Sequence, residues 1–262
     1  RLRPNLFIIT THELLGAALI IKVVTGSKII YDVQENYYRN IKFTPAFPPL
    51  LRPLLSFFVR LKEYVASPFV DHFFLAEAGY LQELKFAQRR STVIENKLKK
   101  PYERPIGKRG HSRNKLLFSG TLSESTGVFT AIDLAIKLHA LNSDITLTLI
   151  GFCAQPIMLQ KIKTTIEPYT FIQLTGGDKL VPHAQVLEQI QRADVGIIAY
   201  PFNPATYNST PTKLYEYLGY KLPILLIDHS QWVKRCEPYQ AAVVFDPDRV
   251  NAKNLWQALT TQ

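Results

Sequence analysis

Residues 207–228, YNSTPTKLYEYLGYKLPILLID, decide the predicted fold of this chain. They predict a loop, a helix, a turn and a buried strand, in that order. Thr210 suits the helix N-cap, and Pro211 suits the first helical position, where a missing N–H costs no hydrogen bond. Gly219 is expected to end the helix, and the apolar run from Ile224 to Ile227 is expected to form the strand.

Two charged residues lie near the start of that helix: Lys213 in the first turn, and Glu216 three residues later on the same face. A helix N-terminus favours anions because its N–H groups are free and its dipole end is positive. A lysine there suits a phosphate, and a carboxylate one turn deeper suits a sugar diol. The pair therefore predicts a pocket for a nucleotide diphosphate, with Glu216 on the ribose. The competing interpretation is an i,i+3 surface ion pair, which is common and weak.

The order of elements around the helix supports the pocket. A strand at 194–199, a proline-bearing loop, this helix and the strand at 224–227 resemble the donor-binding region of GT-B glycosyltransferases. The resemblance is greatest to the retaining family 4 enzymes of bacterial polysaccharide synthesis. It implies that Glu216 binds the nucleotide ribose and that Lys213 lies near the phosphates, in a catalytic position. Many members carry a second glutamate eight residues earlier, where this chain has Asn208.

Composition bounds the class of protein. The 262 residues suffice for two domains, and 47% hydrophobic with 20% charged residues is typical of a core-forming globular chain. The sequence has no run of eighteen apolar residues, so no membrane-spanning helix is expected. The net charge of +10 suits an anionic partner: nucleic acid, a phospholipid surface or a phosphorylated substrate. No nucleic-acid recognition motif is present, which argues against the first.

Cysteine and acidic motifs bear on redox state and metals. Cys153 and Cys236 lack metal-binding spacing, and free buried thiols in a reducing compartment are the simplest interpretation. This favours a cytoplasmic location. No Asp-x-Asp motif occurs, so we expect neither a metal nor a cofactor beyond the nucleotide-sugar donor, which is a substrate.

The N-terminal region predicts a parallel sheet. A buried strand at 5–10, a helix at 12–24 closed by Gly26, and a strand at 28–32 form a βαβ unit. Ligands of such sheets collect at the carboxyl ends of strands, where His12 and Glu35 fall. We assign both to the acceptor side, and capping of helices and turns is the competing role. The segment KIIYDVQE at 28–35 resembles part of the N-domain of the same glycosyltransferases.

Residues 43–69 have two interpretations. A proline-broken loop precedes an apolar helix at 54–65 that carries Arg60 and Lys62. Basic residues among exposed aromatic and aliphatic ones fit an element that touches lipid head groups. The alternative is a helix packed in the core, with lysine and arginine heads reaching water. A lipid-linked acceptor would make the first arrangement useful.

A third strand at 71–77 and a fourth at 91–95 complete the first domain. Glu77 ends the third strand, so we expect it to face the interdomain cleft and to act in catalysis. The polar, basic run at 97–113 is the best linker. We place the boundary near residue 105, which gives a partial N-terminal domain at 1–105 and a donor-binding domain at 106–262.

The second domain begins with a strand at 115–119, a loop from Gly120 to Gly127 and a helix at 128–141, a sequence of elements that can cradle an anion. An ordinary βα turn is the competing interpretation. In the resembled family this loop commonly holds an arginine and a lysine on the diphosphate, and here Thr121 and Thr126 stand at those places.

The rest of the second domain alternates strands and helices. Strands are expected at 146–150, 171–174, 194–199, 224–227 and 242–245, and helices at 156–166, 184–193 and 252–259. By resemblance, the backbone of the loop at 176–183, with Gly177 and Lys179, contacts the donor. His183 is expected to serve as an ordinary first residue of its helix.

These observations predict an α/β protein of GT-B type with two Rossmann-like parallel-sheet domains, the first incomplete. The first two or three strand–helix units of the family are expected to be missing. Either a second copy covers the apolar sheet surface thus exposed, or the missing units were trimmed from a longer precursor.

The expected activity is retaining transfer of a sugar from a nucleotide-diphosphate donor to a glycan or lipid-linked acceptor in cell-surface polysaccharide synthesis. The expected location is cytoplasmic, with a peripheral position at the inner face of the membrane left open. The alternatives are a GT-B nucleotide-sugar epimerase and a non-catalytic nucleotide- or glycan-binding module.

Overall fold

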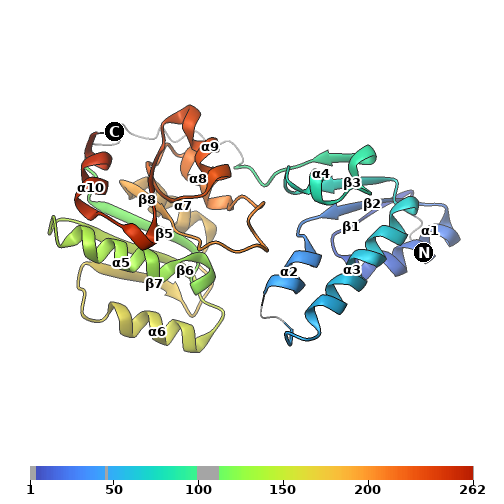
Figure 1. Cartoon of the computed structure of the whole chain (residues 1–262), viewed down its shortest axis with the longest axis horizontal. Helices are drawn as coiled ribbons and strands as arrows, with labels where there is room; N and C mark the ends of the chain where they lie inside the picture. The colour runs from blue at the N-terminus through green and yellow to red at the C-terminus, as the bar shows by residue number, and fades with distance from the viewer. Residues whose placement is uncertain (1–3, 45–46, 99–111, 262) are drawn as a thin grey trace. The chain divides into compact units, whose positions relative to one another are not determined.

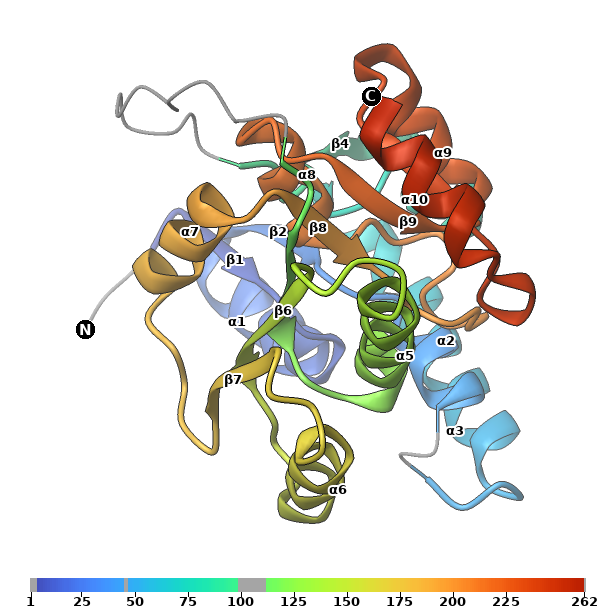
Figure 2. The same ribbon diagram turned by 90° about the vertical axis from the view of Figure 1, so that its left-hand side faces the viewer.

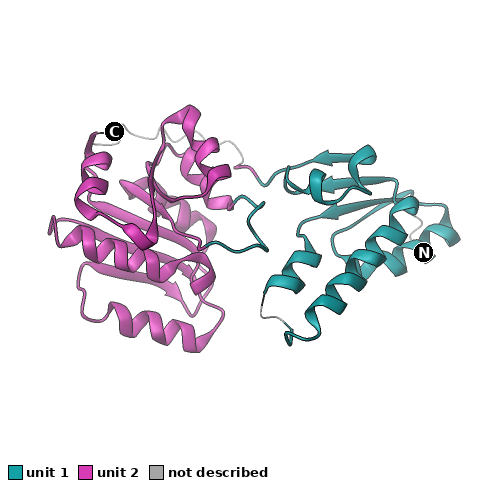
Figure 3. Cartoon of the chain, in the orientation of Figure 1, with its two compact units in different colours: residues 1–96, 202–210 teal, residues 97–201, 211–262 magenta. Residues whose placement is uncertain are grey.

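A computed structural model describes residues 4–44, 47–98 and 112–261, and it divides the chain into two compact units (Figures 1 and 3). Unit 1 comprises residues 1–96 and 202–210, and unit 2 comprises 97–201 and 211–262. The predicted boundary at residue 105 lies outside the described residues. The sequence did not indicate that 202–210, between two elements of unit 2, belongs to unit 1.

Unit 1 is built on a four-stranded parallel sheet in the order β1-β2-β3-β4. Its strands are β1 (Leu6–Ile9), β2 (Lys28–Val33), β3 (His72–Leu75) and β4 (Ser91–Val93). Its α-helices are α1 (Leu15–Thr25), α2 (Tyr37–Phe43), α3 (Arg52–Ala66) and α4 (Tyr80–Glu83). Because each right-handed crossover moves the chain in the same direction, the connecting helices lie on one face of the sheet.

Burial in this sheet follows that arrangement. Tyr31 and Phe73 point to the helix-covered face and are fully buried, whereas their neighbours Ile30 and Phe74 are only partly covered. The predicted βαβ unit is confirmed. The prediction that β1 is buried is wrong for Leu6, which is exposed, because β1 is an edge strand with β2 as its only partner among the described strands.

Unit 2 holds a six-stranded parallel sheet in the order β10-β9-β8-β5-β6-β7. Its strands are β5 (Lys115–Thr121), β6 (Thr146–Phe152), β7 (Ile172–Gly177), β8 (Val195–Ile198), β9 (Ile224–Ile227) and β10 (Ala242–Phe245). Its α-helices are α5 (Val128–His139), α6 (Pro156–Ile166), α7 (His183–Arg192), α8 (Thr212–Gly219), α9 (Ser230–Cys236) and α10 (Ala252–Thr261). All strands predicted for this unit are confirmed, whereas α9 was not predicted.

The strand order reverses between β5 and β8, so the crossovers place helices on both faces. Figure 2 shows α5 and α7 on opposite sides of strands β6 and β7. A continuous core of buried side chains lies between sheet and helices and includes Phe118 and Tyr217. Cys153 and Cys236 are buried free thiols in this core, as predicted.

The decisive helix begins later than the sequence predicted. α8 starts at Thr212 with Pro211 as its N-cap, and Thr210 provides no side-chain cap. The reason is that Thr210 is held in unit 1, where its backbone N–H donates to Glu77 Oε1 at 2.8 Å. The strand at Ile224–Ile227 has the predicted bounds.

One glycine of unit 2 is required by close backbone approach. Gly127 has φ +80°, and a Cβ there would lie 1.8 Å from the carbonyl oxygen of Ala199. We expect Gly127→Ala to lower the free energy of unfolding by about 2–4 kcal/mol, because strain and a backbone clash add. Trp232 and Trp256 both lie in unit 2, so their fluorescence in urea reports this unit. The exposed neighbour Ser125 provides the control, since Ser125→Ala should change stability by less than about 0.5 kcal/mol. Equal midpoints for the two variants would contradict the clash.

Candidate functional site

Glycines form the carboxyl edge of three neighbouring strands in unit 2. Gly120, Gly151 and Gly176 pair with one another in register at the ends of β5, β6 and β7. Gly151 has φ +155°, and a Cβ there would lie 1.6 Å from the carbonyl oxygen of Gly120. These glycines keep side chains off the edge and let the strand ends approach one another closely. This is also the end of a parallel sheet where ligands bind.

Lys213 reaches this glycine edge from α8. Lys213 is only 5% exposed, and its Nζ lies 4.5 Å from the centre of the Phe118 ring and 5.0 Å from the centre of the Tyr200 ring. A Cβ added to Gly120 would be 3.4 Å from the same nitrogen. Among the described residues, no oxygen or nitrogen accepts a hydrogen bond from Nζ.

Burial lowers the pKa of Lys213 to about 7, and the charge of Glu216 offsets only part of this effect. An ammonium group out of water without a hydrogen bond is costly, and the flanking aromatic faces return only part of that cost. Buried polar groups in folded proteins are nearly always paired, so an orphan of this kind indicates a missing partner. The partner that suits a buried cation is an anion.

Glu216 lies one turn along α8, with its side chain 16% exposed. His183 Nε2, from the first residue of α7, lies 2.8 Å from Glu216 Oε1. The surface ion pair between Lys213 and Glu216 is therefore wrong as an interpretation: Lys213 is buried, and Glu216 has a different partner. His183 is the site residue that sequence reasoning missed, because no spacing rule connects residues 33 positions apart.

The loop between β5 and α5 satisfies its own polar groups. The hydroxyl of Thr126 donates to the Thr121 carbonyl at 2.8 Å and accepts from the backbone N–H of Ser123 at 3.2 Å. The backbone N–H groups of Thr126, Gly127 and Val128 donate to carbonyls of residues 123 and 124. These groups are occupied within the loop, so the loop supplies less to an anion than the sequence suggested, and Lys213 is the stronger candidate. The donor contacts predicted for Thr121 and Thr126 stay predictions.

The loop after β7 holds the other two predicted donor residues. Gly177 is buried, accepts from the backbone of Cys153 at 2.8 Å, and has no room for a Cβ beside Leu159. Lys179 is exposed. Their contacts with a donor stay predictions.

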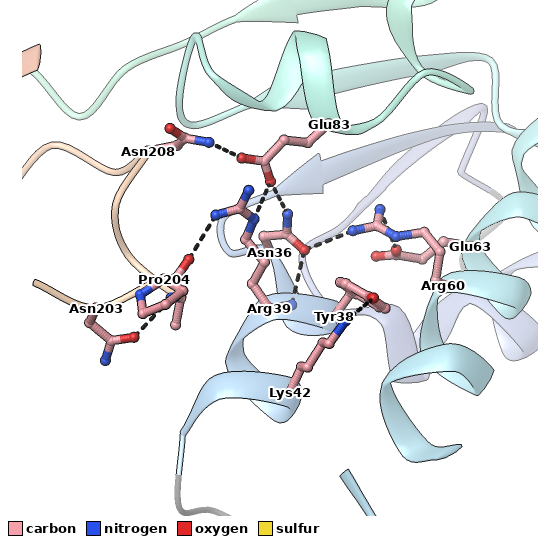
Figure 4. A network of polar contacts seen from close by, with 11 residues as sticks. Asn36, Tyr38, Arg39, Lys42, Arg60, Glu63, Glu83, Asn203, Pro204 and Asn208 are labelled. Carbon is pink, nitrogen blue, oxygen red and sulfur yellow. Dashed lines mark hydrogen bonds and ion pairs between the residues drawn. The ribbon is translucent and has the colours of Figure 1, made fainter. Parts of the chain in front are cut away.

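In unit 1, a set of polar contacts holds the segment 202–210, here called the docked segment (Figure 4). Arg39 donates to the carbonyl of Pro204 at 2.7 Å and lies 3.0 Å from Glu83. Glu83 also accepts from Asn208, the residue at the place of the second family glutamate. A glutamate at 208 would bring two carboxylates together, which explains the amide at this position.

Glu77 also holds the docked segment. It is buried at the exit of β3, and its Oε1 accepts the hydrogen bond from the backbone N–H of Thr210. The structure thus gives Glu77 a positioning contact, and its catalytic role stays a prediction. Thr210, which precedes the helix that carries Lys213, is also predicted from the sequence to contact the donor, and this contact stays a prediction.

The two acceptor-side residues have different surroundings. His12 is buried, with Nδ1 2.8 Å from Lys62 Nζ and Nε2 3.1 Å from Glu13. Burial, and then the charge of Lys62, lowers the pKa of His12, which favours a neutral ring. Glu35 is exposed and accepts from the side chain of Asn40 at 2.6 Å, and its acceptor-side role stays a prediction. A cavity of about 560 Å³ opens beside His12.

In the part of the chain that the structure describes, no group of three or more His, Cys, Asp or Glu side chains is placed to hold a metal ion. The helices described are too short or too polar to cross a bilayer. The expectation of a metal-free site stays a prediction.

Comparison with solved structures identifies the fold. S. aureus TarM is similar over 98% of this chain and 48% of its own (TM-score 0.66, 12% identity). Anabaena HepE in complex with UDP and glucose is similar over 98% of this chain and 67% of its own (TM-score 0.62, 13% identity). The pneumococcal O-GlcNAc transferase GtfA, in complex with UDP and GlcNAc, is similar over 98% of this chain and 48% of its own (TM-score 0.57, 14% identity). No protein-family model and no curated protein sequence matches.

These likenesses show the fold: the two parallel-sheet α/β units are of the GT-B type found in glycosyltransferases. The chain spans about half the length of TarM and GtfA and about two thirds of HepE.

The burial of Lys213 makes a prediction about stability and pH. Its pKa in the folded state lies below the ordinary value of 10.5, so the folded chain loses this proton first as the pH rises, and stability increases between about 7 and 10.5. Lys213→Met keeps the volume and removes the charge. We expect it to be more stable than the wild type by about 2–4 kcal/mol at low pH, with the advantage shrinking above the folded-state pKa.

Urea unfolding followed by tryptophan fluorescence measures this difference at several pH values. Lys163→Met, which changes an exposed lysine of α6, is the matched control and should show no such trend. An advantage for Lys213→Met that is independent of pH would show that the ammonium is not buried as described.

Proposed function

We propose that this protein transfers a sugar from a nucleoside diphosphate sugar to an acceptor hydroxyl. The observation that carries the proposal is the buried Nζ of Lys213, which has no hydrogen-bond partner in the described chain and lies at the glycine edge of the sheet. A diphosphate supplies the anion that this nitrogen lacks. Uridine diphosphate is the first candidate, because the similar structures of HepE and GtfA contain UDP.

The chemistry follows from the charge. The bond between the anomeric carbon and the diphosphate oxygen breaks, a bond from the acceptor oxygen to that carbon forms, and the hydroxyl proton passes to the departing diphosphate or to solvent. Negative charge develops on the leaving oxygen, and a cation preorganised in a site of low dielectric stabilises it. A bound diphosphate also raises the pKa of Lys213 toward its ordinary value, so the lysine is charged when it acts.

Glu216 and His183 form the ribose side of the proposed pocket. If His183 donates to Oε1, the carboxylate keeps its second oxygen free to accept hydrogen bonds from the ribose hydroxyls. The imidazole also fixes the carboxylate's orientation before the nucleotide binds. This gives His183 a positioning role that the sequence did not indicate.

The finer assignments belong to the proposal as well. Retention of the anomeric configuration is proposed from the resemblance to family 4 enzymes. The proposed acceptor is a glycan or a lipid-linked molecule of cell-surface polysaccharide synthesis. The reaction is proposed to take place in the cytoplasm. Glu77 remains the proposed catalytic carboxylate of unit 1. The reaction is proposed to need no metal.

Nucleotide binding provides the first test. We expect UDP or GDP to raise the melting temperature of the wild type, because a ligand that binds only the native state stabilises it. Lys213→Met should weaken binding about tenfold to a hundredfold, the worth of a charge-assisted hydrogen bond. Glu216→Ala should weaken the binding of nucleoside diphosphates but not that of inorganic pyrophosphate, which has no ribose. Lys163→Met is again the control. Absence of any shift with all nucleoside diphosphates would overturn the donor site.

Turnover provides the second test. Released nucleoside diphosphate, measured over a panel of donor sugars, should accompany a new glycosidic bond whose anomeric configuration matches the donor by NMR. Chelation with EDTA should leave the rate unchanged. Nucleotide release without an acceptor product would favour the epimerase, and binding without release would favour the non-catalytic module.

Glu77 can be tested separately from its positioning contact. Glu77→Gln keeps an oxygen that can accept the hydrogen bond from Thr210 but removes the charge. We expect stability to stay within about 1 kcal/mol while kcat falls by at least tenfold, as for a group that acts in the transition state. An unchanged kcat would assign Glu77 to positioning alone.

A further inference from the structure

Helix α3 of unit 1 places its large apolar side chains on the exposed side. The residues it buries are Ser56, Val59, Glu63 and Ala66. Its exposed stripe, here called the α3 stripe, consists of Leu51, Leu54, Phe57, Phe58, Leu61, Tyr64 and Val65. Phe57 is 57% exposed and Tyr64 is 64% exposed. The core-packed interpretation of this helix is therefore wrong for its largest residues. Apolar patches of this kind mark interaction surfaces.

The buried face of α3 explains the inversion. Glu63 accepts from Tyr31 Oη at 3.0 Å and lies 3.2 Å from Arg60, which itself donates to Asn36. These polar contacts fix the side of α3 that faces the sheet. In this orientation α3 buries a paired carboxylate and leaves its large apolar side chains outside.

A cavity of about 560 Å³ adjoins the stripe, a size within the range of small-ligand pockets. One part of its wall is apolar and comes from Tyr37, Ile41, Phe47, Leu55, Phe58 and Val59. The other part is polar and comes from His12, Glu13 and Lys62. Phe58 belongs to both the cavity wall and the α3 stripe, so the two features are continuous. A ligand with an apolar chain and a polar head fits both walls.

Charge selects the kind of amphiphile. Residues 37–66 contain five lysines and arginines but a single acidic residue, Glu63, which is buried. Arg39 and Arg60 are paired with Glu83 and Glu63, whereas no described carboxylate lies within ion-pair distance of Lys42 or Arg52. A basic, apolar surface complements anionic lipid better than it complements an average protein surface.

We propose that unit 1 binds a lipid-linked acceptor at an anionic bilayer: the α3 stripe rests on the lipid, and the cavity takes the apolar chain of the acceptor. Lys62 then meets the phosphate that links chain and sugar, and His12 and Glu13 meet hydroxyl groups. Lipid binding stands by itself, and only the acceptor role rests on the glycosyl transfer proposed above.

Vesicle flotation tests the stripe. The wild type should float with vesicles of phosphatidylcholine that contain about one third phosphatidylglycerol, and a smaller fraction of it should float with vesicles of pure phosphatidylcholine. The double variant Leu54→Glu, Phe57→Glu should bind at least about tenfold more weakly, because two exposed apolar side chains that would enter the lipid become charges. The matched control is Ile157→Glu, which changes an equally apolar residue of α6 in unit 2 that is 87% exposed.

A soluble amphiphile tests the cavity. Dodecyl phosphate, kept below its micelle concentration, should bind the wild type in calorimetry, and inorganic phosphate should not. Val59→Trp fills the cavity and should abolish this binding while vesicle binding through the stripe persists. Leu55→Phe is a milder filling variant that serves if the tryptophan disturbs the fold.

Three results would overturn the proposal. The first is vesicle binding that the stripe variant leaves unchanged. The second is a wild-type dimer that the stripe variant dissociates without any vesicle binding, which would identify a second copy as the occupant. The third is an affinity for dodecyl phosphate that neither Val59→Trp nor Leu55→Phe changes. Loss of the nucleotide-induced melting shift with lipid binding intact would instead overturn the proposed function.

Discussion

The candidate site depends on one costly arrangement: a lysine ammonium inside unit 2 that has aromatic faces around it and no hydrogen-bond partner in the described chain. A folded protein keeps such a group only where something else compensates. Glu216 compensates only in part, and its Oε1 lies 2.8 Å from His183 Nε2. The partner that we propose for this lysine is an anion at the glycine edge.

The parallel sheet supplies that edge. Strand order reverses between β5 and β8, and the loops that leave their carboxyl ends diverge there, so the start of α5 and the start of α8 border one region. Gly120, Gly151 and Gly176 keep side chains out of it. The loop before α5 uses its own N–H groups and the Thr126 hydroxyl internally. The proposed anion site of unit 2 therefore relies on Lys213.

In unit 1, polar contacts form part of the packing of the helices on the sheet. Its helices cover one face of the sheet, and α3 uses its polar residues, not its large apolar ones, to pack there. The docked segment adds a second polar assembly around Glu83 and Glu77. Such networks orient elements at fixed angles because each bond has a direction, whereas apolar packing tolerates rotation. The apolar α3 stripe lies on the side of the helix opposite these polar contacts.

The sequence by itself determined the strands of unit 2 and the parallel character of both sheets, and it supplied the proposal that function centres on the segment around Lys213 and Glu216. These features are local: apolar runs, helix caps and a three-residue spacing express them within a few positions of the chain. Only the tertiary structure decided which partner each side chain has. Lys213 lies against Phe118 of β5 and Tyr200, which follows β8, and Glu216 meets His183 from another helix. The sequence placed Thr210 at the helix cap and Glu77 in a cleft, yet Glu77 holds Thr210 itself. It left open which side of α3 faces water, because that choice depends on Tyr31, Arg60 and Glu63 meeting in space. Burial and pairing are long-range properties, and no spacing along the chain encodes them.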